Sequence, residues 1–463
     1  MQLTPDATKG ALRAALGAMT AALFLATGAS AQDTPASSKP ADINDDTSTD
    51  TSLTRVDSAV LFYQEAGGRV QATEPVVSVT MNDDSGNSIN VKLTADTLTG
   101  ATPNGAAPWT GTQTFITPVK TAGVQTTTTS ASGNKVLVTV PGTNIKAAQY
   151  TADPNTLPVD HGFRDQRYAV DLNYSVAVDN VSRFTIGGNL STEHDYSSLS
   201  GNFGVSRDLN DRNTTISAAV SVEMDTSKPY FGTPEPMTAM SGATKGGNRT
   251  KTVVDAVFGV SQVVNRYWLA QLDYNIDQVS GYQTDPYRII SVVSGTTGAP
   301  VRYLYESRPT SRLRQSLYFG NKIALGPTVA DASMRVYHDS WGINSLTLDV
   351  AERVPVTRWM YVEPHLRYYS QTKANFFHDY LVSGQALPAF ASSDSRLGKF
   401  TATTVGLKVG VHMGPGELYA RAESYDQKGT SHPAGAPGAL AQENLFSGVK
   451  ATSVVLGYSF GFW

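Results

Sequence analysis

The chain has 463 residues, no cysteine and a formal net charge of −4. The absence of cysteine excludes disulfides, thiolate nucleophiles and cysteine-ligated metals, and the mildly acidic balance argues against nucleic acid as a partner. The length would accommodate two or three soluble domains. However, a mean hydropathy of −0.22 together with 40 Gly and 21 Tyr favours one large β-barrel with a polar interior.

The first 31 residues have the features of a secretory signal peptide. Lys9 and Arg13 precede an apolar run from Ala14 to Thr27, which is too short to cross a bilayer as a helix. Small residues at 29–31 provide a cleavage site, so we expect export and a mature chain that begins at Gln32. Residues 32–56 are polar and rich in Ser, Thr and Asp, which predicts a disordered periplasmic tether.

Downstream of the tether, apolar and polar residues alternate in one segment after another, with little helical periodicity. Segments such as Tyr168–Val178 and Trp268–Ile276 place their apolar side chains on one face, as expected of tilted membrane strands of ~9–11 residues. A long series of such segments predicts an all-β protein, a transmembrane antiparallel up-and-down β-barrel. A soluble sandwich, solenoid or propeller is the alternative, but the sequence shows no repeat period.

The connectors between these segments alternate between short and long. Short ones such as Asp179–Ser182 and Asn210–Asn213 fit periplasmic turns, and longer ones such as Glu193–Ser198, Ser280–Pro309 and Gln371–Gly398 fit extracellular loops. Thirteen strands follow Gln166, and three more are expected at Ser58–Tyr63, Val70–Met81 and Ser88–Thr97. The prediction is therefore sixteen strands within a barrel region 57–463, or fourteen if the segments flanking Gly67-Gly68 form a plug.

One long connector, Thr99–Asp165, interrupts the predicted barrel. It is rich in Gly, Pro and Thr and includes Trp109 and Phe115. Such an insertion either folds inward as a plug or outward as a contact surface, and its length alone does not decide between these alternatives. A further strand is expected within it at Val136–Val140, where β-branched residues are concentrated.

The last strand, Lys450–Trp463, is strongly aromatic on one face. An aromatic edge of this kind is an aggregation hazard in a soluble protein, whereas in a membrane barrel it faces lipid and closure removes the edge. The residues expected to direct assembly by the barrel-assembly machinery are Tyr458, Phe460, Phe462 and Trp463.

Seven stretches carry a family resemblance. They are Arg69–Pro75, Asp96–Ala106, Phe163–Arg167, Tyr305–Arg314, Arg335–Trp341, Arg367–Gln371 and Ser393–Gly398. In these stretches the chain resembles a family of Gram-negative outer-membrane proteins catalogued as domain of unknown function 3570. The resemblance implies a barrel of this topology and leaves the solute undefined, because the family has no established substrate.

Polar side chains that face the lumen are the candidates for function, because charges on the lipid face are costly. Strand parity directs the following residues inward: Arg312, Arg314, Lys322, Arg335, Asp339, Glu363, His365, Arg367, Lys408, Glu417, Arg421 and Glu423. One interpretation is a neutralising network that braces the wall, and the other is a selectivity zone for a solute. We favour the network for most of them.

Four arginines within thirteen residues are the expected exception to that network. Arg302 and Arg308 are predicted at the outer mouth with Arg312 and Arg314 nearby, where they would favour anionic or aromatic solutes. Contact with lipopolysaccharide phosphates is the alternative explanation for arginines at this position.

Sixteen strands leave an aqueous lumen unless a loop fills it. The predicted function is therefore a pore or binding barrel for small hydrophilic solutes, including anionic ones, in the cell outer membrane. The alternative is a closed barrel that serves as a docking or maturation platform for a secreted or lipoprotein partner. An outer-membrane hydrolase is disfavoured because the chain has histidines such as His365, His412 and His378 but neither a G-x-S-x-G nor an H-E-x-x-H motif.

No cofactor and no metal are expected. The expected contacts are outer-membrane lipid and lipopolysaccharide, with the barrel-assembly machinery as a partner during biogenesis. The residue pattern leaves the oligomeric state open.

Overall fold

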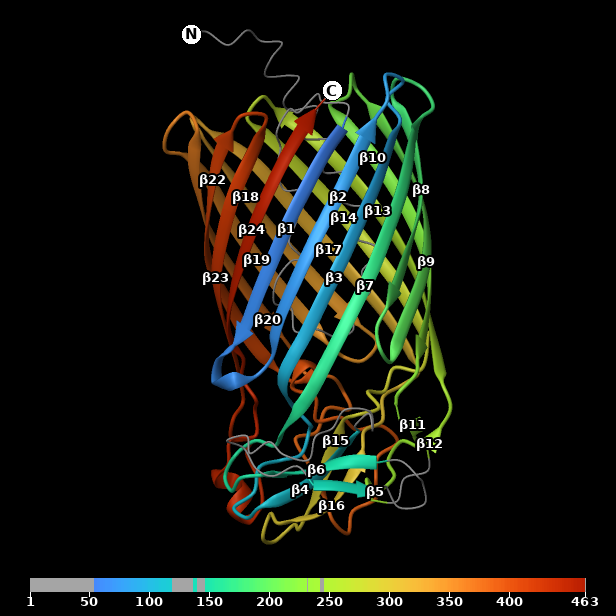
Figure 1. Cartoon of the computed structure of the whole chain (residues 1–463), viewed down its shortest axis with the longest axis vertical. Helices are drawn as coiled ribbons and strands as arrows, with labels where there is room; N and C mark the ends of the chain where they lie inside the picture. Colours follow the sequence, from blue (N-terminus) through green and yellow to red (C-terminus); the bar gives the residue numbers. More distant parts are fainter. Residues whose placement is uncertain (1–53, 119–135, 140–145, 231, 242–244, 463) are drawn as a thin grey trace.

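The computed structural model describes residues 54–118, 136–139, 146–230, 232–241 and 245–462. Within these residues, the main sheet is a closed barrel in the order β1-β2-β3-β7-β8-β9-β10-β13-β14-β17-β18-β19-β20-β22-β23-β24 (Figure 1). In that order the strand bounds are Thr54–Glu65, Gln71–Asn82, Ser88–Pro103, Val159–Ala177, Ser182–Thr192, Tyr196–Leu209, Thr214–Ser227, Arg249–Asn265, Trp268–Gly281, Ser311–Leu325, Thr328–Asp339, Asn344–Pro355, Met360–Gln371, Phe400–Met413, Gly416–Gly429 and Lys450–Phe462. The predicted sixteen-strand barrel is confirmed. The predicted signal peptide, residues 32–53 of the tether and Trp463 lie outside the described residues.

The barrel closes through its first and last strands. β1 and β24 pair antiparallel from Thr54↔Phe462 to Glu65↔Ala451. β1 is therefore a full wall strand of 12 residues, longer than predicted, and the fourteen-strand alternative is wrong. Gly67 and Gly68 adopt φ values of 75° and 69° in the turn that follows, a conformation that glycine reaches without steric cost, so they reverse the chain between β1 and β2.

Side chains alternate between the two faces of the wall as predicted. On β24, Val455 is 8 % exposed, whereas Leu456 and Phe462 are each 49 % exposed. On β17, the outward-facing Leu317 and Phe319 are exposed in the same way. Exposed aliphatic and aromatic side chains in every part of the outer face are unfavourable in water and stable against lipid. The outer surface is therefore that of an outer-membrane type of barrel.

Glycines on the inner face accommodate tyrosine rings of the neighbouring strand. A Cβ atom at Gly410 would lie 2.1 Å from the ring of Tyr361, its cross-strand partner. A Cβ atom at Gly457 would lie 2.3 Å from the ring of Tyr419, which is again the cross-strand partner. An aromatic ring that covers a strand glycine restores packing at that position and fixes the strand register.

Tight turns join the strands at the end of the barrel where β1 begins and β24 ends (Figure 1). Between β2 and β3, the Asp83 carboxylate accepts hydrogen bonds from the backbone N–H groups of Ser85 and Asn87. Between β9 and β10, Asn210, Asp211 and the next residue have φ values of 51°, 55° and 65°. Asn and Asp favour both kinds of turn because their side chains bond the local backbone and tolerate positive φ.

The longer connectors emerge at the opposite end of the barrel and gather there (Figure 1). We call the described residues of five of them, within 104–158, 228–248, 282–310, 372–399 and 430–449, the cap. The cap contains three small sheets, made of β4 (Gln113–Pro118), β6 (Lys146–Ala152) and β5 (Val136–Thr139); of β16 (Pro300–Tyr305), β15 (Ile289–Val293) and β21 (Leu381–Val382); and of β11 (Thr233–Pro234) and β12 (Lys245–Gly246). β5 confirms the strand predicted at Val136–Val140 over the residues described.

Two connectors differ from the prediction. The Thr99–Asp165 connector is shorter, because β3 continues to Pro103 and β7 already begins at Val159. Its described part joins the cap outside the barrel rather than forming a plug (Figure 1). The predicted loop Glu193–Ser198 is a turn of residues 193–195, because Tyr196 begins β9.

The cap has apolar cores of its own. Phe115 and Tyr150 of the β3–β7 connector pack with Ile289 and Tyr305 of the β14–β17 connector. Val292 and Leu304 pack with Leu381, which comes from the β20–β22 connector, in a second cluster. Contacts of this kind between loops that are distant in sequence make the cap a folded unit rather than a set of independent loops.

The helices among the described residues are short. They are the 3-10 turns η2 (Ala66–Gly68), η3 (Ser395–Leu397) and η4 (Gly438–Gln442). None of the helices in the described part of the chain is long and apolar enough to cross a membrane.

Candidate solute pathway

The inner face of β17, β18, β20, β22 and β23 carries all twelve predicted lumen residues. The outward positions between them are apolar and exposed, as at Met334, Leu366 and Leu418, which is the pattern that an inward direction of the twelve residues requires. Successive side chains of a strand point to opposite faces, which is why parity alone could assign these positions.

Ion pairs join ten of the twelve residues to partners on the same wall. The pairs are Arg312–Asp339 at 2.6 Å, Arg314–Asp277 at 2.5 Å, Lys322–Asp331 at 3.5 Å, Glu417–Arg353 at 2.9 Å, His365–Glu423 at 2.9 Å, Arg367–Asp349 at 3.4 Å and Arg421–Glu363 at 3.9 Å. Four of the pairs, those of Arg312, Arg314, Lys322 and Arg367, join adjacent strands, where opposite charges stabilise strand pairing. The other three reach across one or two intervening strands. This geometry corresponds to the bracing network expected for most of the set, and it adds Asp277, Asp331, Asp349 and Arg353 to it.

Two cations of the set contact aromatic rings instead. The Lys408 ammonium is buried and lies 5.6 Å from the ring centre of Tyr361 and 4.7 Å from that of Tyr419. The Arg335 guanidinium lies 5.6 Å from the ring centre of Tyr318. Unlike Lys408, Arg335 is exposed. Because its side chain points into the barrel, this exposure means that the lumen has room for water beside it.

The four arginines predicted near the mouth have different environments. Arg302 is exposed on β16, at the surface of the cap. Arg308 is only 4 % exposed and lies inside the cap, which is a different place from the open mouth expected for it. Arg312 is buried on the inner wall, where it pairs with Asp339 and lies 4.2 Å from the ring centre of Trp341. Arg314 also belongs to the wall network. Three of the four arginines are therefore paired with carboxylates and do not form an unpaired cluster at the mouth.

A buried ionic cluster in the cap contains Arg308, which was predicted at the mouth, together with four residues that the sequence patterns did not single out. Asp394 is fully buried and accepts from Arg288 at 3.1 Å, Arg308 at 2.9 Å and Arg396 at 2.6 Å. Glu306, also fully buried, pairs with Arg308 at 2.6 Å. Since the two loops that supply these residues are far apart in sequence, spacing could not reveal the cluster. The one available signal was that Tyr305–Arg314 and Ser393–Gly398 both lie in family-like stretches.

The pKa values of the two buried acids in this cluster are shifted in opposite directions. Burial alone would raise the pKa of the Asp394 carboxyl, but Arg288, Arg396 and Arg308 together hold that pKa well below its usual range. Burial raises the pKa of the Glu306 carboxyl, and the single nearby Arg308 opposes that rise. The difference follows the number of guanidinium groups around each carboxyl.

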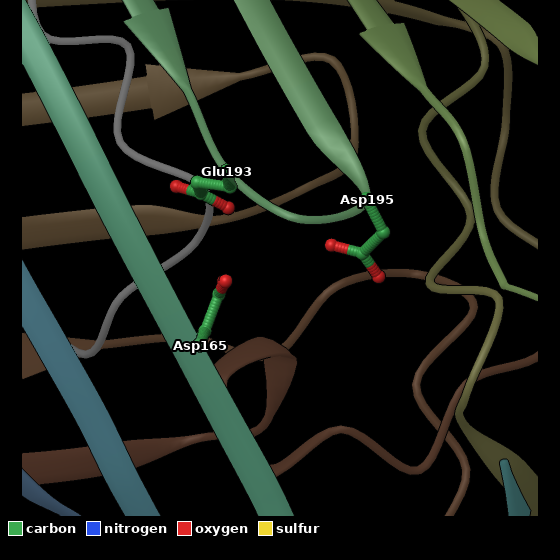
Figure 2. Close-up of side chains that lie close together, drawn as sticks. All are labelled: Asp165, Glu193 and Asp195. Atoms are coloured by element: carbon green, nitrogen blue, oxygen red, sulfur yellow. The ribbon is translucent and has the colours of Figure 1, made fainter. Parts of the chain in front are cut away.

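Three carboxyl groups converge near the junction of barrel and cap. Figure 2 shows Glu193 and Asp195 on the β8–β9 turn and Asp165 on β7, with their carboxyl groups directed towards a common space. Burial, reinforced by Asp165, raises the pKa of the Glu193 carboxyl to about 8. Asp195 accepts a hydrogen bond of 2.5 Å from the Tyr287 hydroxyl of the cap. The negative charge of Asp165 thus favours the protonated form of Glu193.

The histidines of the hydrolase alternative have structural partners. His365 lies 3.1 Å from Asp349 and 2.9 Å from Glu423, and His412 lies 3.5 Å from Glu417. The backbone N–H of His378 donates to the carbonyl oxygen of Ser392 within the cap. His365 and His412 thus belong to the ionic network of the wall.

The comparison with protein families identifies the group to which the chain is related. The sequence profile of the family described as "Protein of unknown function (DUF3570)" matches residues 15–460. The chain belongs to this family. No curated protein sequence matches the chain.

Several solved structures are similar to this barrel. A mutant of the ferric enterobactin receptor PfeA from Pseudomonas aeruginosa has a TM-score of 0.41 at 11% identity, covering 88% of this chain and 59% of the receptor. CdiB from Acinetobacter baumannii has a TM-score of 0.41 at 8% identity, with 88% and 60% covered. OccK5 (OpdH) from Pseudomonas aeruginosa has a TM-score of 0.37 at 8% identity, with 89% and 98% covered. The chain thus spans less than two thirds of the first two proteins and matches the third over nearly its full length.

Proposed function

We propose that this member of the DUF3570 family is a channel or binding barrel of the cell outer membrane for small hydrophilic solutes. The observation that carries the proposal is the contrast between an exposed apolar outer face and an inner face lined with polar and charged side chains, where Arg335 is exposed to the lumen. A closed wall that is stable against lipid outside and wet inside supports passage of polar solutes.

The cap sets the size of the solutes in this proposal. Its apolar clusters and its buried ionic cluster join at least three connectors at the outer end of the barrel. A folded cap restricts access more than separate loops would, because its packed side chains cannot move independently. We therefore propose a narrow, selective pathway rather than a wide general pore.

The same cap supports a second candidate, which is a closed barrel that docks a secreted or lipoprotein partner. The surface of the cap exposes Val301, Leu387 and Phe390 at 58, 40 and 41 %. Exposed apolar side chains of this kind are available for contact with a protein. In this second proposal the lumen would not conduct.

Single-channel recording in a planar bilayer tests both candidates. The purified protein should be compared with a variant in which residues 104–158 are replaced by a short Gly-rich turn. We expect small, stable steps from the intact protein and larger steps from the variant. Steps from the variant alone would favour the closed platform, and silence from both would contradict the channel proposal.

A further inference from the structure

Arg335 differs from the other lumen arginines in its partners. Its cross-strand neighbours are Tyr318 on β17 and Thr347 on β19, and both are uncharged. Arg314 and Arg367 each pair with a carboxylate and expose 22 and 23 % of their side chains, whereas Arg335 has no ion pair within the described residues and is exposed.

Two carboxylates on nearby strands, Asp349 and Asp273, form no ion pair with Arg335 among the described residues. Asp349 lies opposite Ser333, two residues before Arg335 on β18, and it is shared by His365 at 3.1 Å and Arg367 at 3.4 Å. Asp273 lies one strand further on, opposite Tyr318. It attracts Arg335 electrostatically without an ion pair. Its Oδ2 atom accepts from the Gln271 amide at 2.6 Å, and its buried Oδ1 atom has no hydrogen-bond partner among the described residues.

Tyr318 provides a support for the guanidinium. Its ring lies against Gly320 on the same strand, where a Cβ atom would come within 2.8 Å of the tyrosine hydroxyl. With the ring held against the wall, the Arg335 guanidinium lies 5.6 Å from its centre, within the range of a cation–π contact. The positive charge of Arg367 lies close enough to Arg335 to repel it, so this part of the wall presents two guanidinium groups.

We propose that Arg335 is an anion-binding residue of the lumen and that this wall takes small solutes carrying a carboxylate or phosphate group. The inference rests on the proposed function and names its substrate class. A guanidinium without a carboxylate partner offers paired N–H donors that match the oxygens of both groups.

The absence of cysteine from the chain allows a direct test in the full-length protein. Thr347→Cys places one thiol on β19 directly opposite Arg335. The protein, reconstituted in phosphatidylcholine vesicles, is treated with a negatively charged and a positively charged methanethiosulfonate reagent of similar size. The ratio of the two modification rates reports the local preference for anions.

We expect Arg335→Gln to lower that ratio about tenfold, as the loss of one nearby charge implies, and Arg335→Lys to preserve it. The matched control is Lys92→Gln, which removes one cation from β3, eight strands from β18 around the closed barrel and therefore on the opposite wall. The ratio should change less than about twofold there, because separated charges in water are screened. An unchanged ratio in Arg335→Gln, or an equal change in both variants, would overturn the inference.

Modification of the Thr347→Cys thiol also distinguishes failure of this inference from failure of the proposed function. A thiol that reacts with neither reagent would mean that solutes do not reach the lumen, which overturns the proposed function and the inference together. A thiol that reacts with a ratio independent of Arg335 leaves the proposed function standing and overturns only the inference.

Protection experiments distinguish the two sources of anion. If millimolar inorganic phosphate slows the reaction of the Thr347→Cys thiol with the methanethiosulfonate reagents and succinate does not, the solute carries a phosphate group. The reverse result would assign a carboxylate. Loss of the protection in Arg335→Gln is expected in either case. Absence of protection by both anions would contradict binding at Arg335.

Discussion

Arginines serve different purposes in the cap and in the lumen. In the cap, Arg308 is 4 % exposed and lies between Glu306 and Asp394, which are both fully buried. In the lumen, Arg335 is exposed and lies 5.6 Å from the ring centre of Tyr318, without an ion pair among the described residues. Burial with complete pairing makes an arginine structural, whereas exposure without pairing leaves its donors available to a solute.

The cap and the lumen also differ in the free energy lost when one partner of an ion pair is removed. Charges in the cap have been removed from water, so each depends on its partners, and loss of one partner leaves a buried charge behind. On the inner wall, partly exposed charges such as Arg367 and Asp349, whose side chains are 23 and 22 % exposed, keep contact with water in the lumen, which replaces a lost partner at modest cost. The cap should therefore be sensitive to single charge substitutions that the lumen tolerates.

The largest effect is expected at the centre of the cap cluster. Asp394→Asn should lower the free energy of opening of the cap by about 3–5 kcal/mol, because three guanidinium groups would lose their common acceptor. Hydrogen exchange of cap amides measures this quantity. The matched lumen variant Asp349→Asn should cost about 1 kcal/mol or less, and equal losses would contradict the distinction between cap and lumen.

A packing substitution on the inner wall should have the next largest effect. Gly410→Val would place methyl groups where the Tyr361 ring now lies, so unfolding in urea should show a loss of about 1–3 kcal/mol. Gly201→Val is the control, because the nearest atom to a Cβ there is 4.0 Å away. A loss at Gly201 as large as that at Gly410 would refute the role of the ring contact.

The junction of cap and barrel should respond to pH. The folded-state pKa of Glu193 is raised to about 8, above an unfolded value of about 4.3. Its contribution to stability is therefore fully present below about pH 4.3 and is lost as the pH rises through about 8. The protection factors of amides in the β8–β9 turn, which compare the observed exchange rate with the base-catalysed rate of an unfolded chain at the same pH, should fall between pH 5 and 9, and Glu193→Gln should remove this fall. An unaltered pH profile in that variant would sink the explanation.

The smallest effect on the free energy of unfolding is expected at Arg335, the residue proposed to determine the preference of the lumen for anions. Arg335→Gln should change the free energy of unfolding by no more than about 0.5 kcal/mol, as at exposed sites without a specific partner. Arg308→Gln serves as the comparison and should destabilise the cap well beyond that. A large loss from Arg335→Gln in the same urea titration would show that Arg335 is part of the bracing network.

The sequence by itself determined the barrel. An apolar period of two, seen from β1 to β24, assigns each side chain to lipid or lumen without reference to distant residues. Turn chemistry at positions such as Asp83 and Asn210 separates the strands, and both signals are local. For this reason the strand count and the closing strand were predictable.

Only the tertiary structure decided which of those charges are neutralised. Arg308 and Asp394 are 86 residues apart in the chain, and the loops that carry them meet only because apolar side chains from several connectors pack into one cap. Likewise, the strand register determines that Arg335 faces Tyr318 and Thr347 while Arg314 faces Asp339 across one ladder and Asp277 across the other. Pairing depends on register and on loop packing, and neither is contained in the local pattern from which inward and outward faces can be read.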